Sequence, residues 1–573
     1  MAVAMGARGS RTTQHNTQGD ITGGEYITLY YLQLDPCLSR SLFLLLNQSN
    51  IVPPKLDSLL SAHVAIWRTR GKQLYRDIYT MRLPRQLGRA IATGAREGLA
   101  KTDTSALRTL HDIPAAAPSE DPCYLHQQCD ELHRRLGPIF RRHLGQHELV
   151  FVADASLIQS VIHNEGPHPH HSVPPCWTYY NKLNNLQRGV FFQTGEPWAR
   201  LRKPLADILL REPKSITKFA QDIIRVNNDM MREWLDGHKG RGDFVLRDVK
   251  RELCRWSIEA TGAMLFGTRM GCIATQDSPR TDCDRAEQLV DNVTEMFAMT
   301  SKFQAIPVEQ AHRLNSDEWR RFEASMTAML RISDQYAEDY ISKAKHSPTN
   351  TGLIRDMIEC GALSEDDIRQ GVVDLIIASA DTTSTALQWM LYLLSCHRDS
   401  LARVQEESAV VLRPRYDLTN YREVAPYTFS FMRETLRLYP TAPFLARTLD
   451  HDITLSNYRI PAGTPIVFSL YTTSRMSEYF EQPLAFSPDR WSRHNTVDNT
   501  GCPIRRTNSS ASLPFGIGRR MCLGKRMAEL QMFLLLASFA AKFDCSPIDE
   551  QVNIKLTMTL GPERPIQLKL RPV

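Results

Sequence analysis

Cys522 is the residue whose surroundings point most directly to chemistry. It lies in a loop, residues 513–524, that is rich in glycine and arginine, and an apolar pattern typical of a helix follows at 527–541. Unpaired N–H groups at a helix start and nearby cations favour a thiolate over a thiol. A thiolate held in this way suits an axial position on iron. The alternative is a buried cysteine that serves as a small core hydrophobe.

Asp381 and Thr382 form a second candidate group. A capping-box pattern at Ser364 to Asp367 predicts the start of an apolar helix that continues to about His397, roughly 50 Å long. An acid and an alcohol in the middle of a buried helix can relay protons, because the hydroxyl passes a proton on and the carboxylate resupplies it. The alternative is an ion pair for Asp381 and a hydroxyl of Thr382 that bonds its own helix backbone.

These two groups belong to motifs that resemble the cytochrome P450 family. Phe515, Gly518, Arg520, Cys522 and Gly524 match the haem-binding signature F-x-x-G-x-R-x-C-x-G position by position. Four further segments also match family motifs: Trp198-x-x-x-Arg202, Ala378-Ser-Ala-Asp381-Thr382, Glu434-x-x-Arg437 and Phe486-Ser-Pro-Asp-Arg490. The resemblance runs from about Leu136 to the C-terminus. It implies a mainly α fold with small β-sheets (α+β), in which haem b lies between the helix of Asp381 and the helix after Cys522.

The resemblance also implies a role for each matching residue. Cys522 would be the axial ligand of the haem iron, with Asp381 and Thr382 as the catalytic pair. The remaining haem-binding residues would be Trp198, Arg202, Arg447, Phe515, Gly516, Arg520 and Gly524. Glu434, Arg437 and Arg490 would form a buried structural network, whose loss costs several kcal/mol when a charge is left unpaired.

One residue departs from the family pattern. Ser379 stands where the family usually has a glycine that lets the helix open a groove for O₂. A serine there can bond the carbonyl of Leu375 and bend the helix instead. The departure puts the shape of the groove in doubt rather than the chemistry.

Further features resemble the mitochondrial members of the family, among them Glu165-Gly166-x-x-Pro169. The resemblance implies electrons from an adrenodoxin-like ferredoxin and its NADPH reductase. Arg433, Lys525 and Arg526 would present positive charge to the acidic ferredoxin, because complementary charge speeds association. Phe429 replaces a second lysine of the family at this surface, so one contact is missing. Solvated surface charges are the alternative for each of these residues.

Four segments are similar to the insect ecdysteroid 2-hydroxylases: 176–181, 187–192, 255–259 and 373–377. This similarity implies hydroxylation of 2-deoxyecdysone at C2. The alternatives are another mitochondrial steroid hydroxylase, acting at C22 or C20, and a haem-thiolate isomerase. Isomerases of that kind often lack the acid–alcohol pair, which argues against the second alternative. A haem-binding sensor without turnover is a third possibility.

Composition excludes several other classes. A net charge of +6 over 573 residues, without a basic-aromatic repeat, does not favour nucleic acid. The 12 cysteines form no C-x-x-C pair, which argues against a zinc site. The longest early apolar run, at residues 42–46, is far shorter than the ~20 residues of a membrane-spanning helix. The resemblance to the mitochondrial members of the family implies peripheral contact with the inner mitochondrial membrane, on the matrix side.

The N-terminal part divides into two segments ahead of the enzyme domain. Residues 1–80 match nothing in the family, and we expect them to be an extension of the gene model. Residues 81–112 begin with an arginine-rich, acid-poor, amphipathic stretch, the composition of a mitochondrial transit peptide; an exposed basic helix is the alternative. Residues 113–573 are expected to form the P450 monooxygenase domain.

Overall fold

The computed structural model describes residues 108–573, except for 119–120, 145–146, 212, 239–241, 276–278, 305, 347–350, 414–416 and 493–508. The expectations for residues 1–80, and for 81–107 of the transit peptide, lie outside the described residues. Arg108 belongs to the folded unit: its N–H donates to the carbonyl of Asn457 (2.9 Å), and its own carbonyl accepts from the N–H of Arg459 (2.8 Å).

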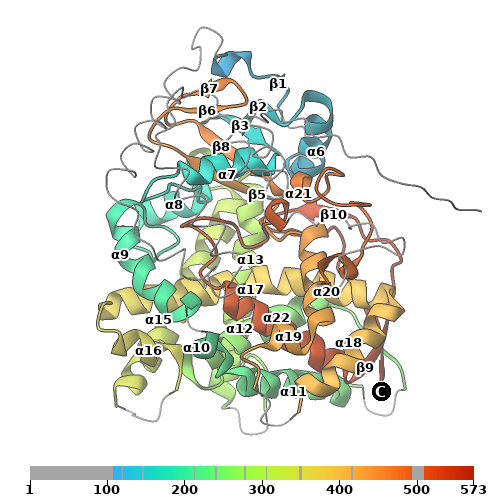
Figure 1. Ribbon diagram of the computed structural model, residues 1–573. Helices are drawn as coiled ribbons and strands as arrows, with labels where there is room; N and C mark the ends of the chain where they lie inside the picture. The colour runs from blue at the N-terminus through green and yellow to red at the C-terminus, as the bar shows by residue number, and fades with distance from the viewer. Residues whose placement is uncertain are drawn as a thin grey trace, which may run out of the picture. The chain divides into compact units, whose positions relative to one another are not determined.

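The largest sheet has five strands in the order β1-β2-β3-β8-β5. Their bounds are Ala115–Ala116, Ile139–Leu144, His147–Val152, Pro465–Ser469 and Phe444–Thr448. β8 pairs parallel with β3 and antiparallel with β5. Its apolar run Ile466 to Phe468 is buried on both faces, as expected for an inner strand. The sheet lies at one end of the described domain, beside α7 (Figure 1).

Three smaller sheets complete the β structure of the described residues. One joins β4 (Phe244–Leu246), β12 (Leu568–Pro572) and β9 (Phe543–Pro547). The others are the hairpins β6–β7 (Ile453–Leu455, Tyr458–Ile460) and β10–β11 (Ile554–Leu556, Leu560–Pro562).

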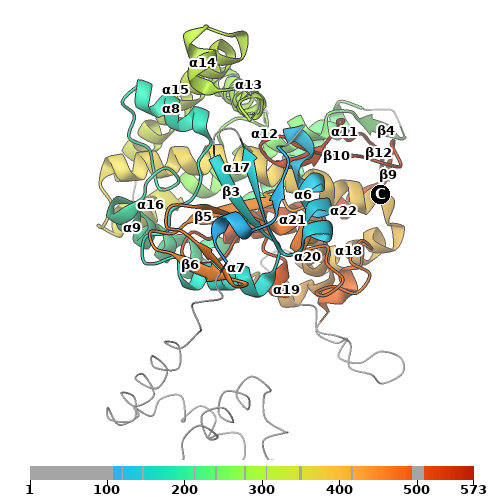
Figure 2. The same ribbon diagram turned by 90° about the horizontal axis from the view of Figure 1, so that it is seen from above.

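Helices form most of the remaining domain (Figures 1 and 2). They are α6 (Leu125–Leu136), α7 (Ala155–His163), α8 (Pro175–Leu183), α9 (Gly195–Ala206), α10 (Pro213–Thr217), α11 (Ala220–Asp236), α12 (Val249–Phe266), α13 (Arg280–Lys302), α14 (Val308–Arg313), α15 (Asp317–His346), α16 (Leu353–Glu359), α17 (Glu365–Cys396), α18 (Arg398–Val411), α19 (Tyr421–Val424), α20 (Pro426–Leu438), α21 (Leu470–Thr473) and α22 (Lys525–Ala540). No helix of the described part is long and apolar enough to cross a bilayer.

The long helix α17 crosses the middle of the domain (Figure 1). Its predicted capping box is confirmed: the hydroxyl of Ser364 accepts from the N–H of Asp367 (3.1 Å), and the carboxylate of Asp367 accepts from the N–H of Ser364 (3.0 Å). The helix ends at Cys396, one residue before the predicted end. From Thr383 to Ser395 it is buried all round, as expected of a helix inside a large core.

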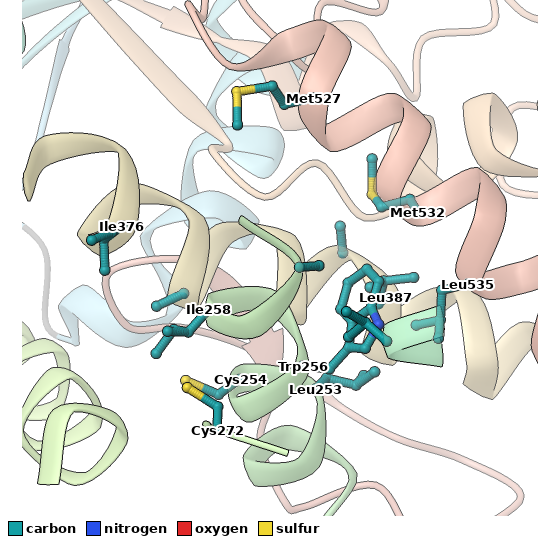
Figure 3. Packing of buried hydrophobic residues seen from close by; sticks show 14 of the residues in the cluster. Leu253, Cys254, Trp256, Ile258, Cys272, Ile376, Leu387, Met527, Met532 and Leu535 are labelled. Atoms are coloured by element: carbon teal, nitrogen blue, oxygen red, sulfur yellow. The ribbon is translucent and has the colours of Figure 1, made fainter. Parts of the chain in front are cut away.

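The main core lies where α12, α17 and α22 meet (Figure 3). Trp256 of α12 and Leu387 of α17 are fully buried there, together with Met532 and Leu535 of α22. α22 begins at Lys525, two residues before the predicted position. The predicted mainly α architecture with small sheets is confirmed, and its packing fixes the helix of Asp381 against the helix that follows Cys522.

Candidate active site

The loop of Cys522 is shaped by glycines. Gly516 and Gly518 have positive φ angles, +71° and +78°, which side chains disfavour. A Cβ on Gly518 would lie 2.4 Å from Oε1 of Glu165, so only glycine fits. The N–H of Cys522 donates to the carbonyl of Phe515 (2.9 Å), which closes the loop just before α22.

The side chain of Cys522 is exposed, although many protein atoms surround its thiol. Burial raises its pKa; the N–H of Gly524 and the charges of Arg202 and Lys525 act in the opposite direction and are outweighed. Burial therefore opposes the thiolate form that the nearby charges and the N–H group favour. Coordination to a metal cation deprotonates a thiol outright, so iron held at this position would supply the thiolate form.

Three guanidinium groups from distant parts of the chain converge around this loop. Arg202 of α9 donates from Nη2 to the carbonyl of Met521 (2.6 Å). Arg447 of β5 donates from Nη2 to the carbonyl of Ile517 (3.2 Å). Arg520 lies over the ring of buried Trp198, 4.2 Å from its centre. The structure thus brings together the residues that the sequence assigned to haem binding.

These cations repel one another in a buried setting. Burial, together with the charges of Arg447 and Arg202, lowers the pKa of Arg520 to about 10. Within the described residues, Glu165 is the carboxylate bonded to this group, through Arg447. Three positive charges and one negative charge leave a surplus that two carboxylates would balance. The cluster therefore fits the two propionates of haem, as the thiol fits its iron.

Glu165 is the functional residue that motif matching did not assign. Its side chain is 4% exposed and accepts from Nε of Arg447 (2.8 Å) and from the N–H of Arg519 (2.8 Å). It thereby holds β5 and the cysteine loop together. The sequence carried one signal for it, the segment Glu165-Gly166-x-x-Pro169, whose role becomes clear only from these contacts.

Asp381 and Thr382 lie in the middle of α17, where Ala378 and Thr382 are exposed although most neighbouring residues are buried. The hydroxyl of Thr382 donates to the carbonyl of Ala378 (2.7 Å). The carboxylate of Asp381 accepts from Lys250 (2.6 Å) and Thr559 (2.8 Å). Asp381 is thus in an ion pair and Thr382 bonds its own helix backbone, which are the two structural alternatives to a proton relay. A relay would require the hydroxyl of Thr382 to turn away from the carbonyl of Ala378.

Ser379 bonds differently from the expectation. Its hydroxyl donates to the carbonyl of Ile376 (2.9 Å) rather than to that of Leu375. Its own carbonyl accepts from the hydroxyl of Ser257 on α12 (2.8 Å). The serine is therefore tied to a neighbouring helix, and α17 stays continuous through this point.

Glu434 is the centre of the expected structural network. Its carboxylate accepts from Arg437 (2.7 and 2.9 Å) and Arg490 (2.9 Å), and also from the indole of Trp491 (2.9 Å). Burial acts to raise the pKa of Glu434, but the hydrogen bonds and charges of Arg437 and Arg490 outweigh it and the pKa is lowered. The carboxylate therefore stays ionised, and the network ties α20 to the loop of Arg490.

The residues expected at the ferredoxin surface are all half-buried. Lys525 and Arg526 begin α22, three and four positions after Cys522. Arg433 instead lies 3.9 Å over the ring of Trp491, where burial lowers its pKa. Arg422 of α19, to which no sequence motif pointed, has an exposed guanidinium that lies 4.8 Å over the ring of Phe429.

Comparisons with known proteins agree with this geometry. The cytochrome P450 family profile matches residues 121–570. The chain is 32% identical to cytochrome P450 315a1, mitochondrial, of Drosophila melanogaster over 81% of this chain and 86% of that protein. It is 31% identical to 25-hydroxyvitamin D-1 alpha hydroxylase, mitochondrial, of Homo sapiens, over 81% and 93%. It is 28% identical to the cholesterol side-chain cleavage enzyme, mitochondrial, of Oncorhynchus mykiss, over 76% and 83%.

Proposed function

The chain belongs to the cytochrome P450 family, as a haem b monooxygenase of its mitochondrial clan, and from this premise we propose that it hydroxylates 2-deoxyecdysone at C2 to give ecdysone. The reaction inserts one atom of O₂ into a C–H bond and reduces the other to water, with two electrons and two protons. The carrying observation is sequence similarity: four segments resemble insect ecdysteroid 2-hydroxylases, and an insect mitochondrial P450 shares 32% identity.

Two of these four segments meet at a buried ion pair. Arg188 and Asp374 are 3.2 Å apart with side chains 8% exposed. A third segment contributes Trp177, whose ring lies near those of Phe192 and Phe297 (5.9 and 5.7 Å between centres). Trp177 and Phe297 are buried in this aromatic cluster, and relatives named for vitamin D and cholesterol support a sterol-like substrate.

Each residue of the site has a defined task in this proposal. Haem, when bound, supplies the chemistry that activates O₂. Cys522 would hold its iron, and Arg202, Arg447 and Arg520 would bind its carboxylates. Asp381 and Thr382 would deliver the two protons that the reduction of O₂ to water consumes.

Electrons would come from an adrenodoxin-like ferredoxin and its NADPH reductase. The cations Lys525 and Arg526 lie at the start of α22, close in sequence to Cys522, and support docking of an acidic partner there. Arg433 lies against the ring of Trp491, so it would attract the ferredoxin by its charge rather than by direct contact.

We further propose a place on the matrix side of the inner mitochondrial membrane, with peripheral contact. Leu314, between α14 and α15, is 66% exposed and offers apolar surface for such contact. The transit peptide would be removed ahead of Arg108, because Arg108 already pairs with the folded domain.

The product formed from a panel of deoxyecdysteroids tests the proposed reaction. Purified protein, ferredoxin, its reductase and NADPH should give a C2 alcohol from 2-deoxyecdysone, and the Cys522→Ser variant should give none. Hydroxylation at C22 or C20 without a C2 product would contradict the proposal and identify another steroid hydroxylase. Turnover without NADPH would instead indicate an isomerase.

A further inference from the structure

The carboxylate of Asp381 is held by two side chains that come from outside its own helix. Nζ of Lys250, on α12, donates to Oδ1 (2.6 Å), and the hydroxyl of Thr559 donates to Oδ2 (2.8 Å). Lys250 also donates to the hydroxyl of Thr385 (2.6 Å), which lies 3.2 Å from that of Thr559. Four side chains thus form a closed ring, in which each oxygen of the carboxylate has a fixed donor.

Thr559 belongs to the turn between β10 and β11, which is anchored on both sides. The indole of Trp389, on α17, donates to the carbonyl of Leu560 (2.9 Å), and the N–H of Leu560 donates to the carbonyl of Thr441 (3.0 Å). On the other side, the amide of Gln304, two residues past the end of α13, donates to the carbonyl of Thr557 (2.7 Å). The turn therefore connects the end of α13 with the acid in α17.

A carboxylate whose two oxygens accept from fixed donors cannot rotate freely, so its direction depends on where those donors lie. Lys250 alone would leave Oδ2 free to reorient. Thr559 removes this freedom, and its position depends in turn on the hairpin rather than on α17. The direction in which Asp381 presents its lone pairs consequently depends on the β10–β11 turn as well as on Lys250 of α12.

We propose that Thr559 is a positioning residue for proton delivery: through its hydrogen bond to Asp381, the β10–β11 turn couples the end of α13 to the acid of the relay. The inference rests on the proposed monooxygenase function. A displacement of α13 or of the turn would be transmitted to Asp381 through Gln304, Thr557 and Thr559. The delivery of protons by Asp381 would then depend on the positions of α13 and the β10–β11 turn. A well-placed Asp381 would limit the loss of reduced oxygen as hydrogen peroxide.

The test compares two substitutions at Thr559 with a matched control. Thr559→Val removes the hydroxyl and keeps the volume, whereas Thr559→Ser keeps the hydroxyl. Thr454→Val makes the same change in the β6–β7 hairpin. We expect Thr559→Val to raise the ratio of hydrogen peroxide to hydroxylated product roughly three- to tenfold and to enlarge the solvent deuterium effect on product formation. Thr559→Ser and Thr454→Val should behave as the parent.

A double mutant separates this role from a purely structural one. If Thr559 acts through Asp381, Thr559→Val should add nothing to the peroxide ratio of Asp381→Asn. Additive effects, or a parental ratio in Thr559→Val, would overturn the inference. A larger dissociation constant for the substrate, with an unchanged ratio of peroxide to product, would also overturn it. That result would make Thr559 a substrate contact. Substrate-induced spectral shifts measure this constant without turnover.

The two proposals fail in different ways. The product of the parent enzyme tests the C2 assignment, and the peroxide ratio among variants tests Thr559 with any steroid that the parent hydroxylates. A C22 product with the expected ratios would contradict the first proposal and support the second.

Discussion

At the scale of single residues, Cys522 illustrates how the protonation state of a thiol can depend on its ligand. Its pKa is raised by burial despite Arg202 and Lys525, so the surrounding charges only moderate the cost of a thiolate. We expect Cys522→Ser to abolish the red-shifted carbonyl band of the reduced protein, because an alcohol is a far weaker donor to iron. The carbon monoxide difference spectrum measures this. A retained band would show that another residue is the axial ligand.

Thr382 tests the relay directly. Thr382→Ala should retain haem and the carbonyl band, because Thr382 contributes a backbone hydrogen bond rather than a core contact. Product per NADPH should fall by about 10- to 100-fold while NADPH is still consumed, with the difference released as hydrogen peroxide. Parallel assays of NADPH, peroxide and product give the result. Intact coupling in this variant would remove Thr382 from the relay.

The same residues show what the sequence could and could not predict. Spacing located Cys522, Asp381 and Thr382, because each stands at a fixed offset within one helix or loop. It missed Glu165 and Thr559, whose partners lie 282 and 178 positions away. Such contacts arise from the tertiary packing of distant elements, which no local pattern encodes.

At the scale of elements, helix boundaries followed local rules and were predicted to within two residues for α17 and α22. The capping box of Ser364 and Asp367 is a local device, and so is the side chain of Asp154, which accepts from the N–H of Leu157 (2.8 Å) at the start of α7. The bond made by Ser379 was assigned to the wrong carbonyl, because the carbonyls three and four residues back are both within reach of a helical serine.

Glu434 shows how one buried charge can secure two elements. In Glu434→Gln, Arg437, which is fully buried, would lose its counter-charge. We expect the variant to lose about 3–5 kcal/mol of unfolding free energy. Chemical denaturation measures the change. The control is Arg134→Gln in the pair with Asp130, where the arginine side chain is 71% exposed, and its effect should stay within about 1 kcal/mol. Equal effects in both variants would contradict the network assignment.

At the scale of the whole molecule, the charge pattern at the start of α22 concerns association with a partner. Arg422 stacks on Phe429 and pairs with Glu529 (2.5 Å), so it places a cation where the family lysine is missing. We expect Arg422→Gln to weaken ferredoxin binding about three- to tenfold at low salt and to reduce its salt dependence. Titration of ferredoxin at two ionic strengths measures both.

Adding Phe429→Lys to that variant should restore binding, because it returns a cation to the same surface. Arg320→Gln, a similar loss of an exposed arginine on α15, should leave binding unchanged. If Arg320→Gln weakened binding as much as Arg422→Gln, the effect would reflect net charge rather than a docking surface.

Histidines buried in a neutral form make the stability of the whole domain depend on pH. Burial, with a contribution from Arg475, lowers the pKa of His126 to about 4, and neither of its ring nitrogens has a hydrogen-bond partner within the described residues. Burial likewise lowers the pKa of His133 to about 4. As pH falls below 6.5, these two histidines become protonated in the unfolded chain. In the folded chain they stay neutral until about pH 4. Stability is therefore complete above pH 6.5 and is lost between these values.

His126→Phe removes one of these protonation sites and keeps an aromatic ring beside Tyr471, whose centre lies 4.9 Å from that of the histidine. We expect little change at pH 8, where the histidine is neutral in both states. At pH 4 the variant should be more stable than the parent by on the order of 3 kcal/mol, because 2.5 pKa units no longer oppose folding. Urea unfolding between pH 8 and pH 4 measures the slope. A variant with the parental slope would show that His126 takes up its proton without unfolding, and that the acid sensitivity arises at other groups.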